Sequence, residues 1–490
     1  MEQEATRKAL VAVDLGAQSC RVSLLRWNQG EPEIRVIHRF ANSPLATAEG
    51  LRWDGEAIFQ GIKTGLRLCA ARAPEGIASV GVDGWGVDYA RLDEKGEVIA
   101  KPFCYRDART EQAEKEVHAI IPAARLYALT GIQILRINTV YQLYADKSSG
   151  GDSSLRWLNV PEYMIYRLGG KAVSEYTNAT HTGLVKIGTH EWCEEIFREL
   201  GLEVAAAPCV VASGSSVGTI TGELARLPAF RETELVVPAC HDTASAIAAI
   251  PAAGDDWAFI SSGTWSLVGT VLDSPCATDD ARTANFTNLG GVGGKICFLK
   301  NVNGMWLLKQ CMEEWKQGGS RWSLDDLLMR CASLPRPSAL IDVDDPQLML
   351  PGNTIGKIND QLERLGREKF TGEDGAMPAI ANTIFHSLAE RYAEVLSSIS
   401  RITGKKLKRL FIVGGGSQNA FLNRLTTERT GLEVIPSSAE STTIGNFAIQ
   451  LAALEGDWNP SRGVSAAAVA KWAERMTARS PVLSTDRVTN

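Results

Sequence analysis

A single aspartate between two polar residues is the strongest candidate for chemistry in this chain. Asp242 lies between His241 and Thr243, directly after the apolar run Leu235–Ala239. A carboxylate in such a place can take a proton from an alcohol. The next segment, Phe259–Leu267, has the pattern of a strand, a turn rich in hydroxyl groups and glycine, and a second strand. The donors of such a turn can hold a phosphate oxygen, so the two segments together predict phosphoryl transfer to a hydroxyl group.

A second candidate phosphate turn lies near the N-terminus. The apolar run Ala9–Val13 and the run Val22–Trp27 are predicted strands, and Asp14–Arg21 connects them. Asp14 would hold Mg²⁺ through water, because this ion keeps much of its hydration shell. The N–H groups of the turn and Arg21 would contact nucleotide phosphates. An ordinary hairpin with Asp and Gly in its turn is the alternative that this segment alone leaves open.

A tryptophan between two glycines follows the next predicted strand. Ile77–Asp83 is this strand, and Gly84–Tyr89 follows it. The backbone at the two glycines can approach a ligand closely, and the indole of Trp85 offers an apolar wall, as sugar sites often do. A turn with a tryptophan in the core is the alternative, and this segment alone slightly favours it.

Two further polar segments have both a structural and a functional interpretation. Asn301 comes where a strand is predicted to end and the helix Met305–Lys316 to begin, so its amide caps the helix or contacts a ligand hydroxyl. The segment Thr177–Thr182 contains Asn178 and His181, which would lie near a substrate. A structural role is the more frequent outcome for a single histidine in such a segment.

A glycine-rich connection follows a late strand. The strand Leu410–Val413 runs into Gly414–Asn419, and a helix is predicted to start at about Ala420. Three glycines before a helix N-terminus leave room for a flat or anionic ligand against bare backbone. The spacing is neither that of a dinucleotide-binding fingerprint nor that of a Walker A loop. A dinucleotide-dependent oxidoreductase is therefore disfavoured.

Length and composition exclude several classes of protein. A chain of 490 residues suggests two large domains, and the segment 246–256 is the best boundary. The net charge of −6 gives no basic footprint for nucleic acid. Ten cysteines without a C-x-x-C pair and six scattered histidines predict reduced packing residues, with no disulfide framework or zinc site. The start Met1–Glu4 has no signal-peptide pattern, and no apolar run reaches membrane-spanning length. We therefore expect a cytoplasmic protein, and leave open whether it is a monomer or a homodimer.

The two halves of the chain repeat the same pattern. Each half begins with a strand, a turn and a strand, at Val11–Leu25 and Phe259–Val268. Each later has a buried strand that ends in glycines, at Val80–Gly86 and Phe411–Gly416. This pattern predicts a duplicated domain with two facing phosphate turns, a cleft between them that clamps ATP, and closure that excludes water.

These motifs resemble those of a known family. The segment with Asp14, Gly16 and Arg21 and the segment Ser261–Thr264 resemble the two phosphate turns of the actin/hexokinase-like ATPase fold. Gly414–Gly416 resembles the adenosine loop of that fold. Within that fold the chain resembles the FGGY carbohydrate kinases from about Leu10 to Leu454. The branch of that family that acts on L-rhamnulose is similar in Val13–Val22, Gly81–Gly96, Tyr105–Thr110, Asn138–Ala145, His241–Ala246, Ser261–Gly269 and Val413–Leu425.

The resemblance implies a fold and an activity. The fold would be α/β, with two duplicated actin/ribonuclease-H-like domains and a nucleotide and sugar cleft between them. Residues 1–248 would carry the sugar site and the first phosphate turn, and residues 249–490 would bind the nucleotide. The reaction would be transfer of the γ-phosphate of ATP to the 1-hydroxyl of L-rhamnulose, with Mg²⁺ as cofactor.

The resemblance also implies roles for individual residues. Asp242 would be the general base, and Asp14 would hold Mg²⁺ through water. The residues implied to contact ATP are Ala17, Gln18, Ser19, Cys20, Arg21, Thr264, Lys309 and Gly415. The residues implied to contact the sugar are Gly86, His241, Asp242, Thr243 and Asn301.

Two positions depart from the family pattern, and two other activities stay open. Cys20 stands where the family has a flexible glycine, and Lys309 stands where a glutamine is expected, with Gln310 one place on. The first alternative activity is a kinase of the same family for L-fuculose, D-xylulose or a related ketose. The second is a sugar-independent ATPase or filament former, which needs no base at Asp242.

Overall fold

The chain forms two compact units. The computed structural model describes residues 7–350, 352–371, 374–479 and 483–484. The second unit consists of Ala253–Thr270 and Leu299–Ala439, and the first of Met1–Ala252, Val271–Phe298 and Glu440–Asn490. The first change of unit, after Ala252, falls inside the boundary segment 246–256. The sequence predicts two successive domains, residues 1–248 and 249–490. In the structure, the chain returns to the first unit twice, at Val271 and at Glu440.

A mixed sheet forms the centre of the first unit. Its seven strands have the order β11-β12-β6-β1-β2-β3-β19. β1 pairs antiparallel with β2 and parallel with β6, so the predicted N-terminal hairpin is present. The strands are β1 Ala9–Leu15, β2 Ser19–Asn28, β3 Glu31–Ala41, β6 Ile77–Gly84, β11 Ser216–Thr219, β12 Glu234–Val236 and β19 Leu483–Ser484.

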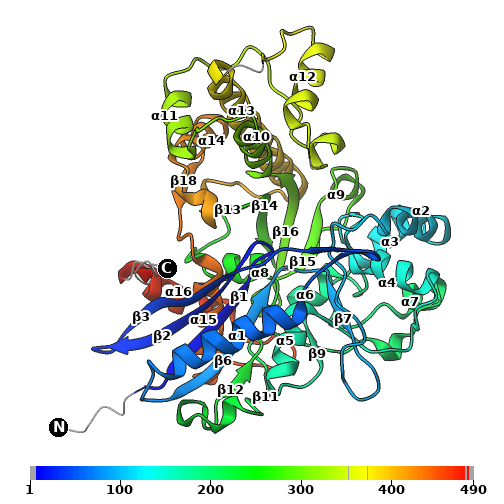
Figure 1. Cartoon of the computed structure of the whole chain (residues 1–490), viewed down its shortest axis with the longest axis vertical. Helices are drawn as coiled ribbons and strands as arrows, with labels where there is room; N and C mark the ends of the chain where they lie inside the picture. The colour runs from blue at the N-terminus through cyan, green and yellow to red at the C-terminus, as the bar shows by residue number, and fades with distance from the viewer. Residues whose placement is uncertain (1–6, 351, 372–373, 480–482, 485–490) are drawn as a thin grey trace. The chain divides into compact units, whose positions relative to one another are not determined.

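Helices cover both faces of this sheet because its central strand is apolar on both sides. Side chains alternate between the faces of a strand. Val11, Val13 and Leu15 of β1 belong to the core that includes α1 Gly55–Ala70. Leu10 and Ala12 belong to the core on the other face, with α15 and α16. Figure 1 shows α1 on one side of the blue strands and α15 Ser441–Leu454 and α16 Ala466–Arg479 on the other.

The first unit also contains short elements between β3 and β12 and two short helices later in the chain. A separate small core joins α2, α4 and α7 through Val117, Tyr141 and Phe197. The helices are α2 Thr110–Ile120, α3 Ala123–Thr130, α4 Thr139–Ser148, α5 Val160–Leu168, α6 Tyr176–His181, α7 Glu194–Leu200, α8 Asp242–Ala248 and α9 Asp279–Thr283. The strands are β4 Leu45–Thr47, β5 Gly50–Arg52, β7 Tyr89–Arg91, β8 Trp157–Asn159, β9 Val173–Glu175 and β10 Cys209–Val211.

A second sheet, made mostly of strands from the second unit, follows a similar plan. Six strands have the order β15-β16-β14-β13-β17-β18. The bounds are β13 Trp257–Ser262, β14 Trp265–Leu272, β15 Thr287–Gly290, β16 Ile296–Asn303, β17 Arg409–Val413 and β18 Glu433–Pro436. Four neighbouring strands have the same pairing in each sheet: β12-β6-β1-β2 in the first and β18-β17-β13-β14 in the second. In both, the first two pairs of neighbours are parallel and the third pair is antiparallel. The repeated pairing matches the duplication predicted from the sequence.

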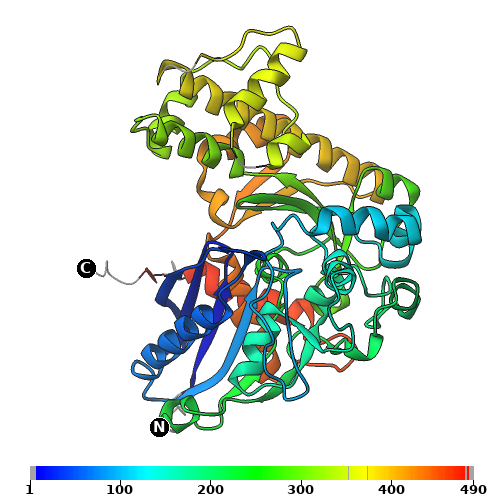
Figure 2. The same cartoon turned by 45° about the vertical axis from the view of Figure 1, so that its right-hand side comes forward.

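Five α-helices complete the described part of the second unit. They are α10 Trp306–Gln317, α11 Leu324–Ala332, α12 Thr354–Arg364, α13 Met377–Thr403 and α14 Ala420–Thr430. The long helix α13 ends where the sequence predicted, because Gly404 adopts the left-handed conformation with φ of +73°. Figure 2 shows this helix in yellow-brown, running beyond the shorter helices of the unit.

The cysteines and the apolar character of the helices were the other features that composition addressed. All ten cysteines lie in the described part of the chain, where each is a free thiol and most are buried. Of the helices that the structure describes, none has the length and apolarity needed to cross a membrane.

The close packing of α8 on α15 in the first unit yields a stability prediction. A Cβ atom at Gly445 of α15 would lie 1.8 Å from the carbonyl oxygen of Ser245 in α8, so the backbones of the two helices would have to separate. We expect Gly445→Ala to lower the free energy of unfolding by about 2–3 kcal/mol, measured by urea denaturation.

The control for this prediction is a glycine with space around it. Gly375 is exposed, and a Cβ atom there meets no heavy atom within 4 Å. Gly375→Ala should leave the urea midpoint close to that of the unsubstituted protein. Equal midpoints for the two variants would show that α8 and α15 tolerate separation.

Candidate functional site

Asp242 is the first residue of α8 and carries a carboxylate suited to take up a proton. The N–H of Thr243 donates to Oδ1 of Asp242 at 2.5 Å, and the Thr243 hydroxyl donates to the same oxygen at 3.2 Å. The Asp242 side chain is 33% exposed, so a ligand can reach it. Burial of the site raises the pKa of Asp242 to about 6, although the Thr243 hydrogen bonds oppose the shift. The group is therefore ionised at neutral pH and more basic than an ordinary aspartate.

A buried carboxylate holds the backbone that leads into α8. The N–H of Cys240 donates to Oε2 of Glu175 at 2.9 Å. The same oxygen accepts the N–H and the hydroxyl of Thr177 at 3.0 and 2.6 Å, and Oε1 accepts the Ser213 hydroxyl at 2.6 Å. The Thr177 hydroxyl in turn accepts the N–H of His241 at 3.3 Å. Glu175 therefore fixes the two residues before Asp242.

The same segment is attached to the central sheet. The carbonyl of Cys240 accepts the N–H of Gly84 at 2.9 Å, and a bridge joins Gly84 to His241. Gly84 is the last residue of β6. Asp242 thus begins its helix at the carboxyl end of a central parallel strand, where ligands of α/β sheets commonly bind.

The predicted first phosphate turn is a tight connection between β1 and β2. A Cβ atom at Gly16 would lie 2.5 Å from the carbonyl oxygen of Ser19, so this position requires glycine. Asn42 closes the turn, because its side chain donates to the carbonyl of Gly16 and its N–H to the carbonyl of Gln18, both at 3.0 Å. Gln18 is exposed, and Ala17 and Ser19 are partly exposed. Their backbone is therefore accessible to a ligand.

Arg21 is paired with carboxylates. Its Nε lies 3.1 Å from Oδ2 of Asp14, and its Nη1 donates to Oε2 of Glu440. Burial raises the pKa of the neighbouring Cys20 thiol to about 12, so this side chain stays a neutral packing group. Cys20 therefore lacks the flexibility of the family's glycine and can offer a ligand only its backbone.

Burial and neighbouring carboxylates raise the pKa of two further acidic groups of the first unit, Asp14 and Asp83. Burial raises the pKa of Asp14 to about 6, Arg21 opposes the shift, and Asp242 adds to it. Burial and then Asp14 hold the pKa of Asp83 well above its ordinary value. Among residues with a described position, no group of three or more acidic, histidine or cysteine side chains could ligate a metal ion directly.

Two amides of α15 support this acidic group, and the sequence analysis missed them. Asn446 donates to Oδ2 of Asp83 at 2.5 Å. Gln450 donates to Oδ1 of Asn446 at 2.7 Å and to the carbonyl of Val11 at 3.0 Å, and it accepts the Ser79 hydroxyl at 2.6 Å. The available signal was an Asn and a Gln four residues apart in the apolar part of the helix.

Trp85 belongs to the core, which is the alternative that its segment favoured. It is 6% exposed, and its ring centroid lies 4.5 Å from that of Trp53. Both indole N–H groups donate to Oδ2 of Asp88, at 3.0 Å from Trp85 and 2.6 Å from Trp53. Trp85 therefore offers little surface to a ligand.

Gly86 is surrounded by side chains of α6. A Cβ atom there would lie 2.4 Å from Nδ1 of His181 and 3.1 Å from Oδ1 of Asn178. The His181 ring also packs on the ring of His241, with centroids 4.5 Å apart. Predicted sugar-binding positions Gly86 and His241 thus share a neighbour that the sequence analysis left undecided.

The corresponding turn of the second unit contacts the start of α10. The N–H groups of Met305 and Trp306 donate to the carbonyls of Gly263 and Thr264, each at 3.2 Å. A Cβ atom at Gly304 would lie 2.8 Å from the Thr264 carbonyl oxygen, so this approach requires glycine. Met305 caps α10 without a side-chain bond, so the capping role considered for Asn301 is wrong. Asn301 is a partly buried residue of β16.

The glycine-rich connection packs beside the same turn. A Cβ atom at Gly414 would lie 2.8 Å from the carbonyl oxygen of Ser262, and one at Gly416 would lie 2.0 Å from the Ser262 hydroxyl oxygen. Gly415 between them is exposed, and no heavy atom lies within 4 Å of its Cβ position. Backbone is therefore open to a ligand at Gly415.

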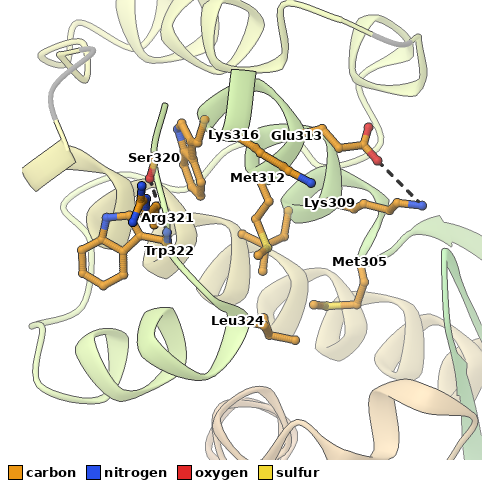
Figure 3. A pocket seen from close by; sticks show the side chains of 11 residues that line it. Met305, Lys309, Met312, Glu313, Lys316, Ser320, Arg321, Trp322 and Leu324 are labelled. Atoms are coloured by element: carbon orange, nitrogen blue, oxygen red, sulfur yellow. Dashed lines mark hydrogen bonds and ion pairs between the residues drawn. The ribbon is translucent and has the colours of Figure 1, made fainter. Parts of the chain in front are cut away.

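A pocket of about 650 Å³ lies along α10 in the second unit. Lys309 lines it, and its Nζ lies 3.8 Å from Oε1 of Glu313 (Figure 3). The wall combines apolar, sulfur-containing and aromatic side chains with three cations: Met305, Leu308, Lys309, Met312, Glu313, Trp315, Lys316, Ser320, Arg321, Trp322 and Leu324. Such a wall suits a flat ring bearing a negatively charged group.

The structure brings most predicted residues together within their own unit. In the first unit, Asp14, Arg21 and Asp242 influence one another electrostatically. In the second unit, the glycines on either side of Gly415 approach Ser262, two residues before Thr264, and Lys309 lies in the first turn of α10.

Comparison with known proteins identifies relatives along nearly the whole chain. The model of the N-terminal domain of the FGGY family of carbohydrate kinases matches residues 9–249, and that of the C-terminal domain matches residues 258–454. A rhamnulokinase from Bacteroides thetaiotaomicron is 35% identical over 90% of this chain and 89% of its own. A rhamnulokinase from Pectobacterium carotovorum is 36% identical over 91% of this chain and 88% of its own.

Solved structures share the fold. A ligand-bound xylulose kinase from Lactobacillus acidophilus has a TM-score of 0.75 at 16% identity, covering 96% of each chain. A glycerol kinase from Plasmodium falciparum, solved with ADP, has a TM-score of 0.70 at 13% identity, covering 98% of this chain and 95% of its own.

The network around Glu175 yields a prediction for stability. Replacing this carboxylate leaves the donors of Thr177, Ser213 and Cys240 buried without an acceptor. We expect Glu175→Ala to lower the free energy of unfolding by about 3 kcal/mol or more, measured by urea denaturation.

An exposed glutamate provides the comparison. Glu223 pairs with Lys63 and Arg67 at the surface of the first unit, and its side chain is 53% exposed. Glu223→Ala should barely move the urea midpoint, because surface ion pairs contribute little. A small effect at Glu175, similar to that at Glu223, would contradict the importance of the network.

Proposed function

The chain belongs to the FGGY family of carbohydrate kinases, and we propose that it transfers the γ-phosphate of ATP to the 1-hydroxyl of L-rhamnulose. The products are L-rhamnulose 1-phosphate and ADP. The observation that carries this proposal is the similarity to rhamnulokinases over about nine tenths of the chain. The two-unit α/β architecture is the actin/hexokinase-like ATPase fold predicted from the sequence. As sequence domains, we propose residues 1–248 for the sugar and residues 249–490 for the nucleotide.

Asp242 is the proposed general base. Its carboxylate is partly exposed, and its raised pKa makes it a better proton acceptor than an ordinary aspartate while leaving it ionised at neutral pH. Thr243 occupies one oxygen, Oδ1, through two hydrogen bonds. The other oxygen, Oδ2, is the one we assign to the sugar hydroxyl. Removing that proton as the phosphoryl group arrives makes the hydroxyl oxygen a better nucleophile.

ATP contacts are proposed for each unit separately. In the first unit we assign phosphate contacts to the backbone of the turn and to the guanidinium of Arg21, which Asp14 and Glu440 hold in place. The turn residues are Ala17, Gln18, Ser19 and Cys20. In the second unit we assign contacts to Thr264, Gly415 and Lys309. The open backbone of Gly415 and the mixed apolar and cationic wall beside Lys309 support a base and phosphates there.

Mg²⁺ is the proposed metal cofactor, and the acidic group of the first unit fits it. Oδ2 of Asp14 and Oδ1 of Asp83 are buried and accept no hydrogen bond, although Asp14 is ion-paired with Arg21. Carboxylate oxygens are the protein ligands that Mg²⁺ prefers, and a hydrated ion needs few of them. When bound, the ion neutralises charge on the phosphate oxygens. Asp14 would hold it through water.

Sugar contacts are proposed for Gly86, His241, Thr243 and Asn301, as the family resemblance implied. Gly86 and His241 share the neighbour His181, and Thr243 and His241 flank Asp242, which supports a common location for these three. We place the enzyme in the cytoplasm, where its proposed phosphate donor is found.

The function is tested by ADP formation with Mg-ATP and a panel of acceptors. The panel contains L-rhamnulose, L-fuculose, D-xylulose, L-ribulose, glycerol and a sample without sugar. We expect L-rhamnulose to give by far the highest kcat/KM. A higher value for another ketose would replace the substrate, and an equal rate without sugar would remove the acceptor from the reaction.

The role of Asp242 is tested by Asp242→Asn. The amide keeps the size and the acceptor for Thr243 but takes up no proton, so we expect sugar-dependent turnover to fall about 10²- to 10⁴-fold. Nucleotide binding and thermal unfolding should stay unchanged. Asp273→Asn, at a side chain that is 87% exposed, is the matched control and should keep full turnover. Turnover of Asp242→Asn near that of the control would falsify the assignment.

A further inference from the structure

Two buried polar atoms of α6 have no hydrogen-bond partner and lie at the same corner of the first unit. They are Oδ1 of Asn178 and Nδ1 of His181. Both lie within 3.1 Å of one point, the Cβ position that Gly86 leaves unused. Buried polar atoms are nearly always paired, so two orphans at one corner indicate a polar ligand that neither helix nor sheet supplies.

The orientation of Asn178 is set by a buried carboxylate. Its Nδ2 donates to Oε2 of Glu162 at 2.9 Å, while Oε1 of Glu162 accepts the N–H of Glu175 at 3.1 Å. Both Asn178 and Glu175 are fully buried. Because the amide nitrogen is engaged with Glu162, the amide oxygen must face the corner at Gly86. The orphan acceptor is thus held in place by the network that also fixes Cys240.

His181 connects this corner to the proposed base. Its ring packs on that of His241 with centroids 4.5 Å apart, and Nε2 of His241 lies 3.7 Å from Oδ1 of Asp242. Burial lowers the pKa of both imidazoles, that of His241 to about 4, so both are neutral at pH 7. A neutral imidazole has one donor and one acceptor. His181 is partly exposed as a residue, while its Nδ1 is buried within the corner.

We propose that His181 and Asn178 bind a hydroxyl group of the acceptor sugar and determine which ketose the enzyme accepts. A sugar hydroxyl donates to Oδ1 of Asn178 and accepts the N–H of His181, which pairs both orphan atoms. This inference rests on the proposed function, because it takes Asp242 to be the base beside the sugar. It adds two residues of α6 to the proposed sugar contacts. It also explains why residue 86 is a glycine, since any side chain there would displace His181.

The geometry also explains why such contacts discriminate between sugars. A site built to pair with a hydroxyl leaves buried polar atoms unpaired when the ligand lacks that hydroxyl. The apolar part of the sugar offers no comparable distinction. Ketoses that differ in one hydroxyl group would therefore be separated at this corner.

The test measures sugar and ATP kinetics for His181→Phe and His181→Gln. Phenylalanine keeps the ring and removes both nitrogens, so we expect the KM for L-rhamnulose to rise about 10- to 100-fold. Glutamine restores one polar atom and should recover part of that loss. The KM for ATP should stay within about twofold, because the substitution removes a contact to the sugar only. Thermal unfolding is recorded for each variant, and His181→Gln carries the test if His181→Phe does not fold.

A second readout separates contact from packing. The unsubstituted protein should discriminate strongly against one member of a series of ketoses that each lack a single hydroxyl. His181→Phe should lose that discrimination and keep the others. The matched control is His386→Phe in α13, where Nδ1 is also buried without a partner and the residue is 7% exposed. It should leave the sugar KM unchanged.

Several outcomes would overturn the inference. One is a sugar KM for His181→Phe within twofold of the unsubstituted protein. Another is an equal rise in the KM for ATP together with unchanged discrimination among the ketoses, which would assign His181 to structure alone. If the unsubstituted protein prefers another ketose, the proposed function fails by itself, and a rise in the KM for that ketose in His181→Phe still supports the inference. A protein that uses no sugar overturns both.

Discussion

The carboxylate of Glu175 is the constraint on which the candidate site depends. It lies in the interior, where a charge is costly unless donors surround it. Thr177, Ser213 and Cys240 supply those donors, and one of them is the backbone N–H two residues before Asp242. Since the carbonyl of Cys240 also accepts from the end of β6, one buried group sets the start of α8 against both the central sheet and α6. The position of Asp242 is thus decided by a residue that is distant in the sequence and close in space.

Burial shapes the electrostatics of the same unit. Asp14, Asp83 and Asp242 all have raised pKa values because burial disfavours their charged forms, and neighbouring carboxylates add to the shift at Asp14 and Asp83. Arg21 offsets part of this charge, and Glu440 holds Arg21 from the other side. Glu440 precedes α15, whose Asn446 pairs with Asp83. The last part of the chain therefore belongs physically to the first unit, because its polar groups complete the surroundings of the acidic residues.

The two units share a pattern of strand pairing and differ in the functional side chains that the strands and helices bear. The hairpin β1–β2 bears an acid and a base, whereas β13–β14 bears hydroxyl groups and glycines beside Gly414–Gly416. In the first unit, helices on both faces of the sheet bury charged groups. In the second, a wide pocket along α10 combines sulfur, aromatic and cationic side chains. A duplicated scaffold has thus acquired carboxylate chemistry in one copy and an open pocket in the other.

Local patterns in the sequence determined the strands around both turns, the start of α14, the end of α13 at Gly404, and Asp242 as the candidate base. Each depends on neighbouring residues: apolar runs, glycine conformations and a lone acid after a strand. Tertiary structure decided between the two interpretations of Trp85, which packs in the core, and it alone decided that Glu175, Asn446 and Glu440 support the site. These three pair with residues 65, 363 and 419 positions away, respectively. No local periodicity encodes such pairs, because packing selects them only once the sheet has brought the segments together.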